Sequence, residues 1–246
     1  SPWPDMERAM KNESVPLYGL ESLSPAKRFD AIGITLQYEL SYTNVLQLID
    51  LSGMRLRSSE RGEEDPLVIG GGSCTVNPEP LAEFFDAFLI GDGEEAMGEI
   101  MGILEMRRSR TISKKQALEA LSALEGFYVP AVHDPSSVSI RRRVLDDLER
   151  FPAALSNEVV PFVECVHDRT VVEVMRGCER GCRFCQAGYI NRPVRERKAS
   201  TVRAAALESS AKCGYDEVSL LSLSTADYSA IGPLVDRMAP ELAEKG

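Results

Sequence analysis

The sequence is poor in the features that mark several classes of protein. Of its 246 residues only two are histidine, and no hydrophobic run is long enough to cross a bilayer. The first residues lack the pattern of a secretory signal peptide. The net charge of −10 argues against a protein that coats nucleic acid. With 43% hydrophobic and 27% charged residues, the composition is that of a soluble globular protein that does not enter a membrane.

Cysteine is present, but not in the pattern of a disulfide-stabilised secreted protein. The chain has six cysteines, and three of them, Cys178, Cys182 and Cys185, fall within eight residues. Such close spacing does not cross-link a chain of this length. We therefore expect a reducing, cytoplasmic environment.

These three cysteines follow a short apolar strand in residues 171–188, which read VVEVMRGCERGCRFCQAG. Three thiolates spaced C-x3-C-x2-C can each bind one iron of a cubane iron–sulfur cluster. A [4Fe–4S] cluster then keeps one iron without a protein ligand, and an open metal position is what catalysis requires. Gly177 and Gly181 let the backbone turn tightly around the cluster.

Zinc is the main alternative occupant of this loop. Zinc prefers four ligands, usually arranged in C-x2-C pairs. His167, Cys165 or Cys213 would have to supply the fourth, and none of them belongs to a second close pair. An iron–sulfur site is therefore favoured. A non-catalytic zinc module and an iron–sulfur module that only transfers electrons stay open as alternatives.

The segment CERGCRFC resembles the C-x3-C-x-aromatic-C signature of the radical S-adenosylmethionine enzymes. The resemblance implies that S-adenosylmethionine chelates the open iron and that the reduced cluster cleaves it to a 5′-deoxyadenosyl radical. It places Phe184 beside the cluster and cofactor, and it implies an electron donor such as flavodoxin or ferredoxin. The substrate cannot be read from these residues, although RNA-modifying members of the family allow RNA as one candidate.

The first half of the chain alternates strands and helices. Residues 30–36, 66–69 and 87–90 read as strands, and residues 1–28 as irregular chain. Predicted helices cover residues 42–51, 78–85, 94–106 and 113–124. We therefore expect a Rossmann-like, doubly wound parallel sheet in a domain of residues 1–125. Ligands bind such sheets at the carboxyl ends of strands, where glycine turns lie at residues 70–72 and 91–93. A tight turn without a ligand is the alternative explanation of both.

Residues 68–100 resemble the second half of the cobalamin-binding domain that precedes some radical S-adenosylmethionine barrels. The residues that match are Gly71, Gly72, Pro78, Glu79, Gly91, Gly93 and Glu94, with a looser match at Thr35. The resemblance implies that cobalamin would contact Thr35, Gly71, Gly72, Gly91 and Gly93. The Asp-x-His-x-x-Gly loop that supplies an axial imidazole in many cobalamin proteins is absent from this sequence. His133 and His167 stand in other contexts, so cobalamin would bind here without a protein imidazole unless that loop lies upstream.

The rest of the chain reads as a connector followed by the start of a barrel. Residues 126–170 form the predicted connector, with short strands at 126–132 and 138–144. After the cysteine loop, a helix over 201–212 capped by Ser200, a strand over 216–224 and a helix over 228–244 give βα repeats. The third domain, residues 171–246, is therefore predicted to hold the first βα units of a partial (β/α) radical S-adenosylmethionine barrel.

A turn after the second of these strands is the predicted cofactor contact. In the family that this chain resembles, a Gly-Gly-Glu loop at this place binds the amino group of S-adenosylmethionine. Ser224, Thr225 and Asp227 stand there instead, with Asp227 in the role of the glutamate. The alternative is that Asp227 only caps the following helix.

Two further expectations concern charge and assembly. Eight basic and two acidic residues lie between Arg176 and Arg203, either as a solvated loop with surface ion pairs or as a field that attracts anions. The 76 residues from Val171 onward hold about two and a half βα units. Because the family barrel closes around about six, we expect part of a longer chain, whose open sheet edge favours dimerisation.

Overall fold

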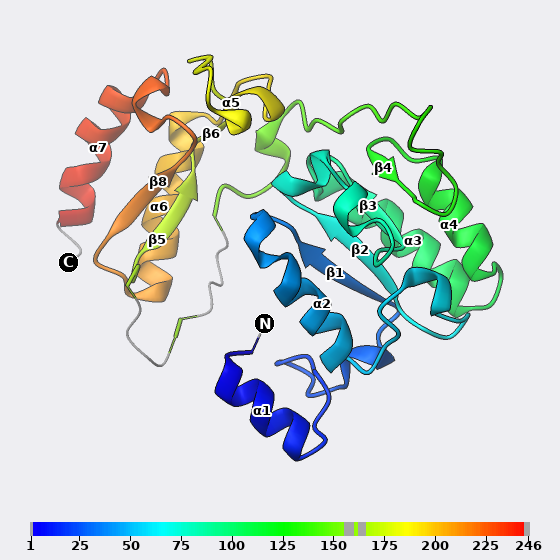
Figure 1. The fold of residues 1–246 in the computed structure, drawn as a ribbon. Coiled ribbons are helices and arrows are strands. Elements are labelled where there is room, and N and C mark those ends of the chain that lie inside the picture. The colour runs from blue at the N-terminus through cyan, green and yellow to red at the C-terminus, as the bar shows by residue number, and fades with distance from the viewer. Residues whose placement is uncertain (1, 155–159, 162–165, 244–246) are drawn as a thin grey trace. The chain divides into compact units, whose positions relative to one another are not determined.

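A computed structural model describes residues 2–154, 160–161 and 166–243. The chain divides into two compact units, Ser1–Val144 and Leu145–Gly246, each with its own sheet and core (Figure 1). The boundary falls inside the segment predicted to be a connector. Among the helices of the described ranges, none combines the length and the apolar character that a membrane span requires.

The first unit is built on a four-stranded sheet in the order β1-β2-β3-β4. The strands β1 (Ala31–Thr35), β2 (Leu67–Gly71) and β3 (Ala87–Leu89) are parallel, and the short β4 (Phe127–Tyr128) runs antiparallel to β3. The three parallel strands confirm the sequence prediction. The predicted strand over 138–144 was wrong, because this segment contributes only one isolated bridge, between Arg143 and Gly91.

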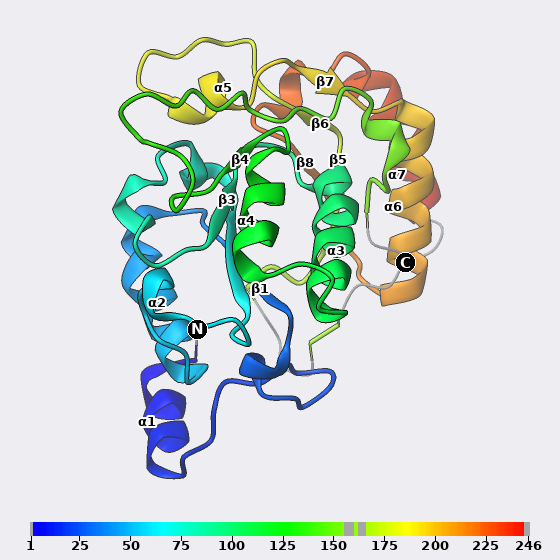
Figure 2. The same ribbon diagram turned by 90° about the vertical axis from the view of Figure 1, so that its right-hand side faces the viewer.

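Helices cover both faces of this sheet, as the prediction of a doubly wound fold requires. The helix α2 (Tyr42–Leu51) packs on one face, and α3 (Glu94–Arg108) and α4 (Lys114–Ser122) lie side by side on the other (Figure 2). Successive strand residues alternate between the two cores. Val68 and Phe88 face α2, whereas Leu67 and Leu89 face α3 and α4.

Two further expectations for the first unit were wrong. Residues 1–28 contain the helix α1 (Pro4–Asn12), because proline is well tolerated in the first turn of a helix. Residues 78–85 form only a 3-10 turn, Glu79–Leu81, and not a full helix. Pro80 lies inside that turn and has no backbone N–H to donate to a longer α-helix.

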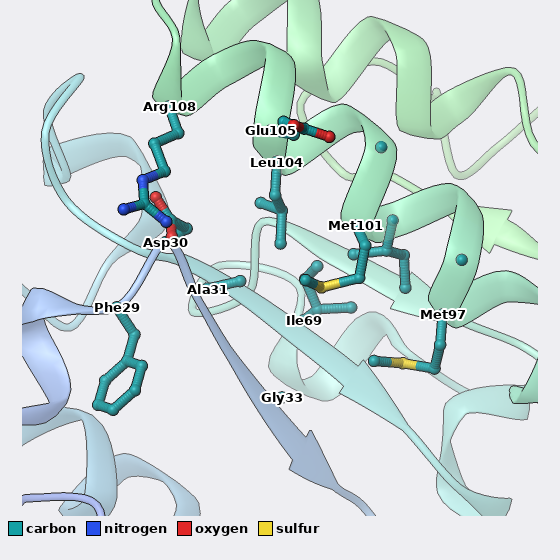
Figure 3. A pocket seen from close by; sticks show the side chains of 13 residues that line it. Phe29, Asp30, Ala31, Gly33, Ile69, Met97, Met101, Leu104, Glu105 and Arg108 are labelled. Atoms are coloured by element: carbon teal, nitrogen blue, oxygen red, sulfur yellow. The ribbon is translucent and has the colours of Figure 1, made fainter. Parts of the chain in front are cut away.

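A cavity of about 690 Å³ lies between the edge strand β1 and the helix α3. Figure 3 shows Met97 and Met101 extending from α3 toward the sheet, where Ile69 and Gly33 lie on neighbouring strands, with Phe29 and Asp30 at one end. None of the glycines predicted to contact a cofactor belongs to the described lining of this cavity. It lies along the strands rather than at their carboxyl ends.

The second unit pairs β5 (Thr170–Glu173) with β8 (Val218–Leu221) in parallel. Between them come β6 (Met175–Arg176), α5 (Gln186–Ile190), β7 (Arg195–Glu196) and α6 (Ala199–Cys213), with β6 and β7 antiparallel. The helix α7 (Ile231–Ala243) follows β8 and packs against α6. Two parallel strands with a helix after each match the predicted βα units. Ser200 lies inside α6 and does not cap it, because the helix already begins after Lys198.

Candidate functional site

The three cysteines of the signature lie on one loop between β6 and α5, beyond the carboxyl end of β5. The loop leaves β6 through Gly177, whose backbone has φ = +84°. A Cβ atom at this position would lie 2.7 Å from the carbonyl oxygen of Pro193. Glycine is therefore required here by the close packing of the loop against its own return segment.

All three thiols are free of disulfide bonds and reachable from solvent. Cys182 is exposed, and Cys178 and Cys185 are half-buried. Within the described ranges, however, no three His, Cys, Asp or Glu side chains lie close enough together to hold a metal ion. The loop thus carries a donor set that fits an iron–sulfur cluster, but its sulfurs must converge before a cluster can bind.

Aromatic residues border this loop in two different ways. Phe184, predicted to lie beside the cofactor, is 92% exposed and covers neither of the adjacent thiols as the loop stands. Tyr189 is anchored, since its hydroxyl donates to the carbonyl of Gly181 at 3.0 Å. The guanidinium carbon of Arg192 lies 4.7 Å from the centre of the Tyr189 ring, within the range of a cation–π contact.

The predicted cofactor turn lies after β8, whose carboxyl end adjoins that of β5. The hydroxyl of Thr225 forms a hydrogen bond of 2.9 Å with that of Ser222, three residues away. Asp227 accepts hydrogen bonds from Ser224 Oγ at 2.6 Å and from Arg180 Nε at 2.6 Å. A second nitrogen of the Arg180 guanidinium, Nη2, donates to the other carboxylate oxygen. The hydrogen bond from Arg180, followed by that from Ser224, holds the pKa of Asp227 below its ordinary value.

A partly buried charge cluster supports the base of the cysteine loop. Glu173, the last residue of β5, accepts from Arg176 Nε at 2.6 Å and from Arg197 Nη2 at 2.8 Å. Burial alone raises the pKa of Glu173, but the hydrogen bonds from the two arginines outweigh it and keep that pKa lowered. The same Arg197 donates to the backbone carbonyls of Leu148, Phe151 and Pro152.

Several of the arginines between Arg176 and Arg203 form ion pairs or hydrogen bonds with other residues of the chain. Arg203 pairs with Glu241, and Arg195 donates to the carbonyl of Leu145 at 2.7 Å. Together with the contacts of Arg176, Arg180 and Arg197, these interactions favour the interpretation of the segment as ion pairs and anchors. They leave less free charge to attract a polyanion.

The glycines predicted to contact cobalamin fall into two groups. A Cβ atom on Gly91 would lie 2.1 Å from the carbonyl oxygen of Arg143, and one on Gly72 would lie 2.8 Å from that of Leu36. The chain itself therefore fills the space beside both. Gly71 has open space around it, and its partner across the sheet, Thr35, is exposed. At Gly93 the nearest atom is the Leu89 side chain, at 3.6 Å.

Neither histidine lies in an axial-ligand context. The Nδ1 atom of His133 accepts from the backbone N–H of Val129 at 3.0 Å, and its ring stacks on Tyr128. Burial, followed by the hydrogen bond to Glu79, raises the pKa of Tyr128 to about 12. His167 lies 3.2 Å from the guanidinium of Arg169. Cys165, a suggested fourth metal ligand, lies outside the described residues.

Sequence reasoning missed the two residues that shape these sites most directly, Arg180 and Arg143. Arg180 stands within the cysteine motif, and its position there was the only available signal. Its partner is 47 residues away. Arg143 belongs to a segment that was predicted as a strand, and its backbone instead pairs with Ile90 and Asp92 beside Gly91.

Comparison with known proteins places the chain in a family. A family model described as "Radical SAM proteins, N-terminal" matches residues 1–130. The Methanocaldococcus jannaschii protein MJ0966 is 28% identical, with 89% of this chain and 44% of that protein covered. The chain thus spans less than half the length of this relative.

A solved structure has a similar fold. It is the radical S-adenosylmethionine methyltransferase TsrM from Kitasatospora setae, with tryptophan substrate and a S-adenosylmethionine analogue bound. The TM-score is 0.53 at 13% identity, with 98% of this chain and 44% of that chain covered. At this identity the likeness concerns the fold alone. Because the family match covers more than half of the chain, the chain belongs to the radical S-adenosylmethionine proteins.

Proposed function

We propose that the second unit binds a [4Fe–4S] cluster through Cys178, Cys182 and Cys185 and presents it to S-adenosylmethionine. The observation that carries the proposal is the position of three free thiols on one loop, beyond the carboxyl end of the parallel strand β5. Active-site groups of βα units gather at this edge. When bound, the cluster would supply the electron that cleaves the carbon–sulfur bond of the cofactor.

The residues of the chain have the tasks of binding and placement in this function. Gly177 allows the loop to fold back on residues 191–193, and Glu173 with Arg176 and Arg197 fixes its base. Ser224, Thr225 and Phe184 would contact S-adenosylmethionine on approach to the cluster. The difficult chemistry belongs to the cofactors, and the protein orients them and limits access of water.

The test is anaerobic reconstitution of the full-length protein with iron and sulfide. We expect broad visible absorption typical of an iron–sulfur cluster, and 5′-deoxyadenosine after reduction in the presence of S-adenosylmethionine. Cys182→Ala should abolish both. Cys213→Ala is the matched control, since this half-buried thiol lies at the end of α6 and outside the loop.

Two outcomes would favour the alternative classes of protein. Stoichiometric zinc with no uptake of iron would identify a non-catalytic zinc module. A stable cluster that yields no 5′-deoxyadenosine would identify an electron-transfer module. An electron donor of the flavodoxin or ferredoxin type, a substrate that includes RNA as a candidate, and a dimer remain parts of the proposal for the whole protein.

A second candidate function is methyl transfer assisted by cobalamin in the first unit. The observation that favours it is the open pair Thr35 and Gly71 at the carboxyl ends of β1 and β2. The fit is partial, because Gly72 and Gly91 are packed against the chain itself, and neither histidine is placed as an axial ligand. The test is corrinoid retention by the full-length protein, which Gly71→Trp should reduce. Gly98→Trp should not reduce it, because Gly98 borders the cavity between β1 and α3 and not the carboxyl ends of the strands.

A further inference from the structure

Arg180 joins the cysteine loop to the turn that follows β8. Its Nε donates to Asp227 Oδ2 at 2.6 Å, and its Nη2 donates to Asp227 Oδ1. The backbone N–H of the same residue lies 3.5 Å from Cys178 Sγ. One residue therefore contacts both a candidate cluster ligand and a carboxylate on the neighbouring βα unit.

Both oxygens of the Asp227 carboxylate already accept hydrogen bonds from its own chain. Arg180 uses both oxygens, and the Ser224 hydroxyl adds a hydrogen bond of 2.6 Å to Oδ2. Only 26% of the Asp227 side chain is exposed. The ammonium group of S-adenosylmethionine would have to displace Arg180 or share an oxygen with it.

We propose that Asp227 is a positioning residue that holds the cysteine loop through Arg180, and that it does not accept the amino group of S-adenosylmethionine. The proposal rests on the proposed function, since the loop that it positions is the candidate cluster site. A bidentate guanidinium–carboxylate contact fixes the relative orientation of the two side chains as well as the distance between them. It keeps the segment between Cys178 and Cys182 at the carboxyl edge that β5 and β8 share.

The size of the effect follows from exposure. Arg180 is 62% exposed, so water and salt screen the pair. Pairs of this kind change an equilibrium or a rate about two- to fivefold. A contact of this strength biases the loop and still lets it close around a cluster.

The first measurement uses the cluster-free, full-length protein. Arg180→Ala and Asp227→Ala should each speed amide hydrogen exchange over residues 178–188 about two- to fivefold. The double variant should be no faster than the faster single variant, because both remove the same contact. Arg183→Ala is the matched control. It lies in the same loop, is exposed, and makes no ion pair within the described part of the chain.

The second measurement uses the same variants after anaerobic reconstitution. Iron loss to a chelator should quicken about two- to fivefold in both single variants and stay unchanged in Arg183→Ala. The combination Arg180→Asp with Asp227→Arg should bring the rate back toward that of the wild type, which separates a lost contact from a folding defect. The dissociation constant of S-adenosylmethionine on the loaded protein, measured by equilibrium dialysis, should change less than about twofold.

The two hypotheses fail in different ways. Unchanged exchange in both single variants overturns the positioning role. So does an Asp227→Ala variant that binds S-adenosylmethionine at least about tenfold more weakly with an unchanged rate of iron loss, since that result makes Asp227 the amino acceptor. A wild-type protein that takes up no iron refutes the proposed function, and the exchange measurement then decides the role of Asp227 by itself.

Discussion

The guanidinium of Arg61 donates a hydrogen bond to Asp86 at 2.9 Å, and their side chains are 0% and 1% exposed. Lys114 Nζ lies 3.1 Å from the other carboxylate oxygen. The backbone N–H of Val68 donates to Asp86 Oδ2 at 2.8 Å. One buried carboxylate thus ties the loop after α2 to β2, to the start of β3 and to the start of α4.

Loss of this carboxylate should destabilise the first unit strongly. Asp86→Ala leaves two buried cations without their counter-ion, and we expect the free energy of unfolding to fall by about 3–5 kcal/mol. Urea denaturation followed by circular dichroism measures the change. The control is Glu83→Ala, which removes an exposed ion pair with Arg57 and should cost less than about 1 kcal/mol. Equal effects of the two substitutions would contradict the special role of Asp86.

Gly91 should tolerate no side chain. Its backbone has φ = +121°, and a Cβ atom would meet the carbonyl oxygen of Arg143. Gly91→Ala should therefore cost at least about 2 kcal/mol and speed exchange of the Asp92 amide, which donates to that carbonyl at 3.1 Å. Gly71→Ala, in open space at the end of the neighbouring strand, should be tolerated. If both variants are equally stable, Arg143 does not close this edge.

Two glycines on adjacent strands should respond to alanine with opposite signs. Gly33 on β1 faces open space beside the cavity of Figure 3, so Gly33→Ala should stabilise the fold by about 0.4–1 kcal/mol. A Cβ atom on Gly70 of β2 would lie 2.8 Å from the Phe88 ring. Gly70→Ala should therefore destabilise the fold by about 1–3 kcal/mol. Thermal denaturation of both variants tests the pair, and a shift in the same direction would count against the described packing.

Acid should weaken the base of the cysteine loop through Glu173. The pKa of this carboxyl is lowered in the folded protein from its ordinary value of 4.5, because the two arginine contacts outweigh burial. Its contribution to stability is therefore complete above that ordinary value and is lost as pH falls through the lowered folded value. We expect the stability difference between wild type and Glu173→Gln to be about 2 kcal/mol at neutral pH and to shrink below about pH 4.5. Urea denaturation at several pH values measures it, and a difference that does not change with pH would contradict the assignment.

Local pattern predicted much of the secondary structure. The helix α2 was predicted with the bounds that it has, because apolar residues at helical spacing and Gly53 after the last turn both act within a few residues. The parallel strands of the first sheet were found for the same reason. The three cysteines of the signature could be recognised from their spacing in the sequence alone. Two predictions at prolines were wrong. Pro4 opens a helix where irregular chain was expected, and Pro80 prevents the helix that was expected over residues 78–85.

Contacts between distant residues could not be predicted from one sequence. The pair Arg180 and Asp227, and the approach of Arg143 to Gly91, depend on how loops from separate strands meet at one edge. Charge and residue type showed that each residue could bind something, but not what it binds. Asp227 and Gly91 were predicted to contact ligands, with a helix cap and a ligand-free turn as the alternatives, and in the structure both contact the chain itself.

The contacts of Arg197 have a consequence for sequence variation. Its side chain is 1% exposed and holds the main chain at Leu148, Phe151 and Pro152 through their carbonyl oxygens. Every amino acid offers the same carbonyl group, so relatives can exchange the side chains at these three positions and keep the attachment. Arginine itself is required at position 197. Lysine, with a single ammonium group, cannot reach all of these acceptors in the same geometry.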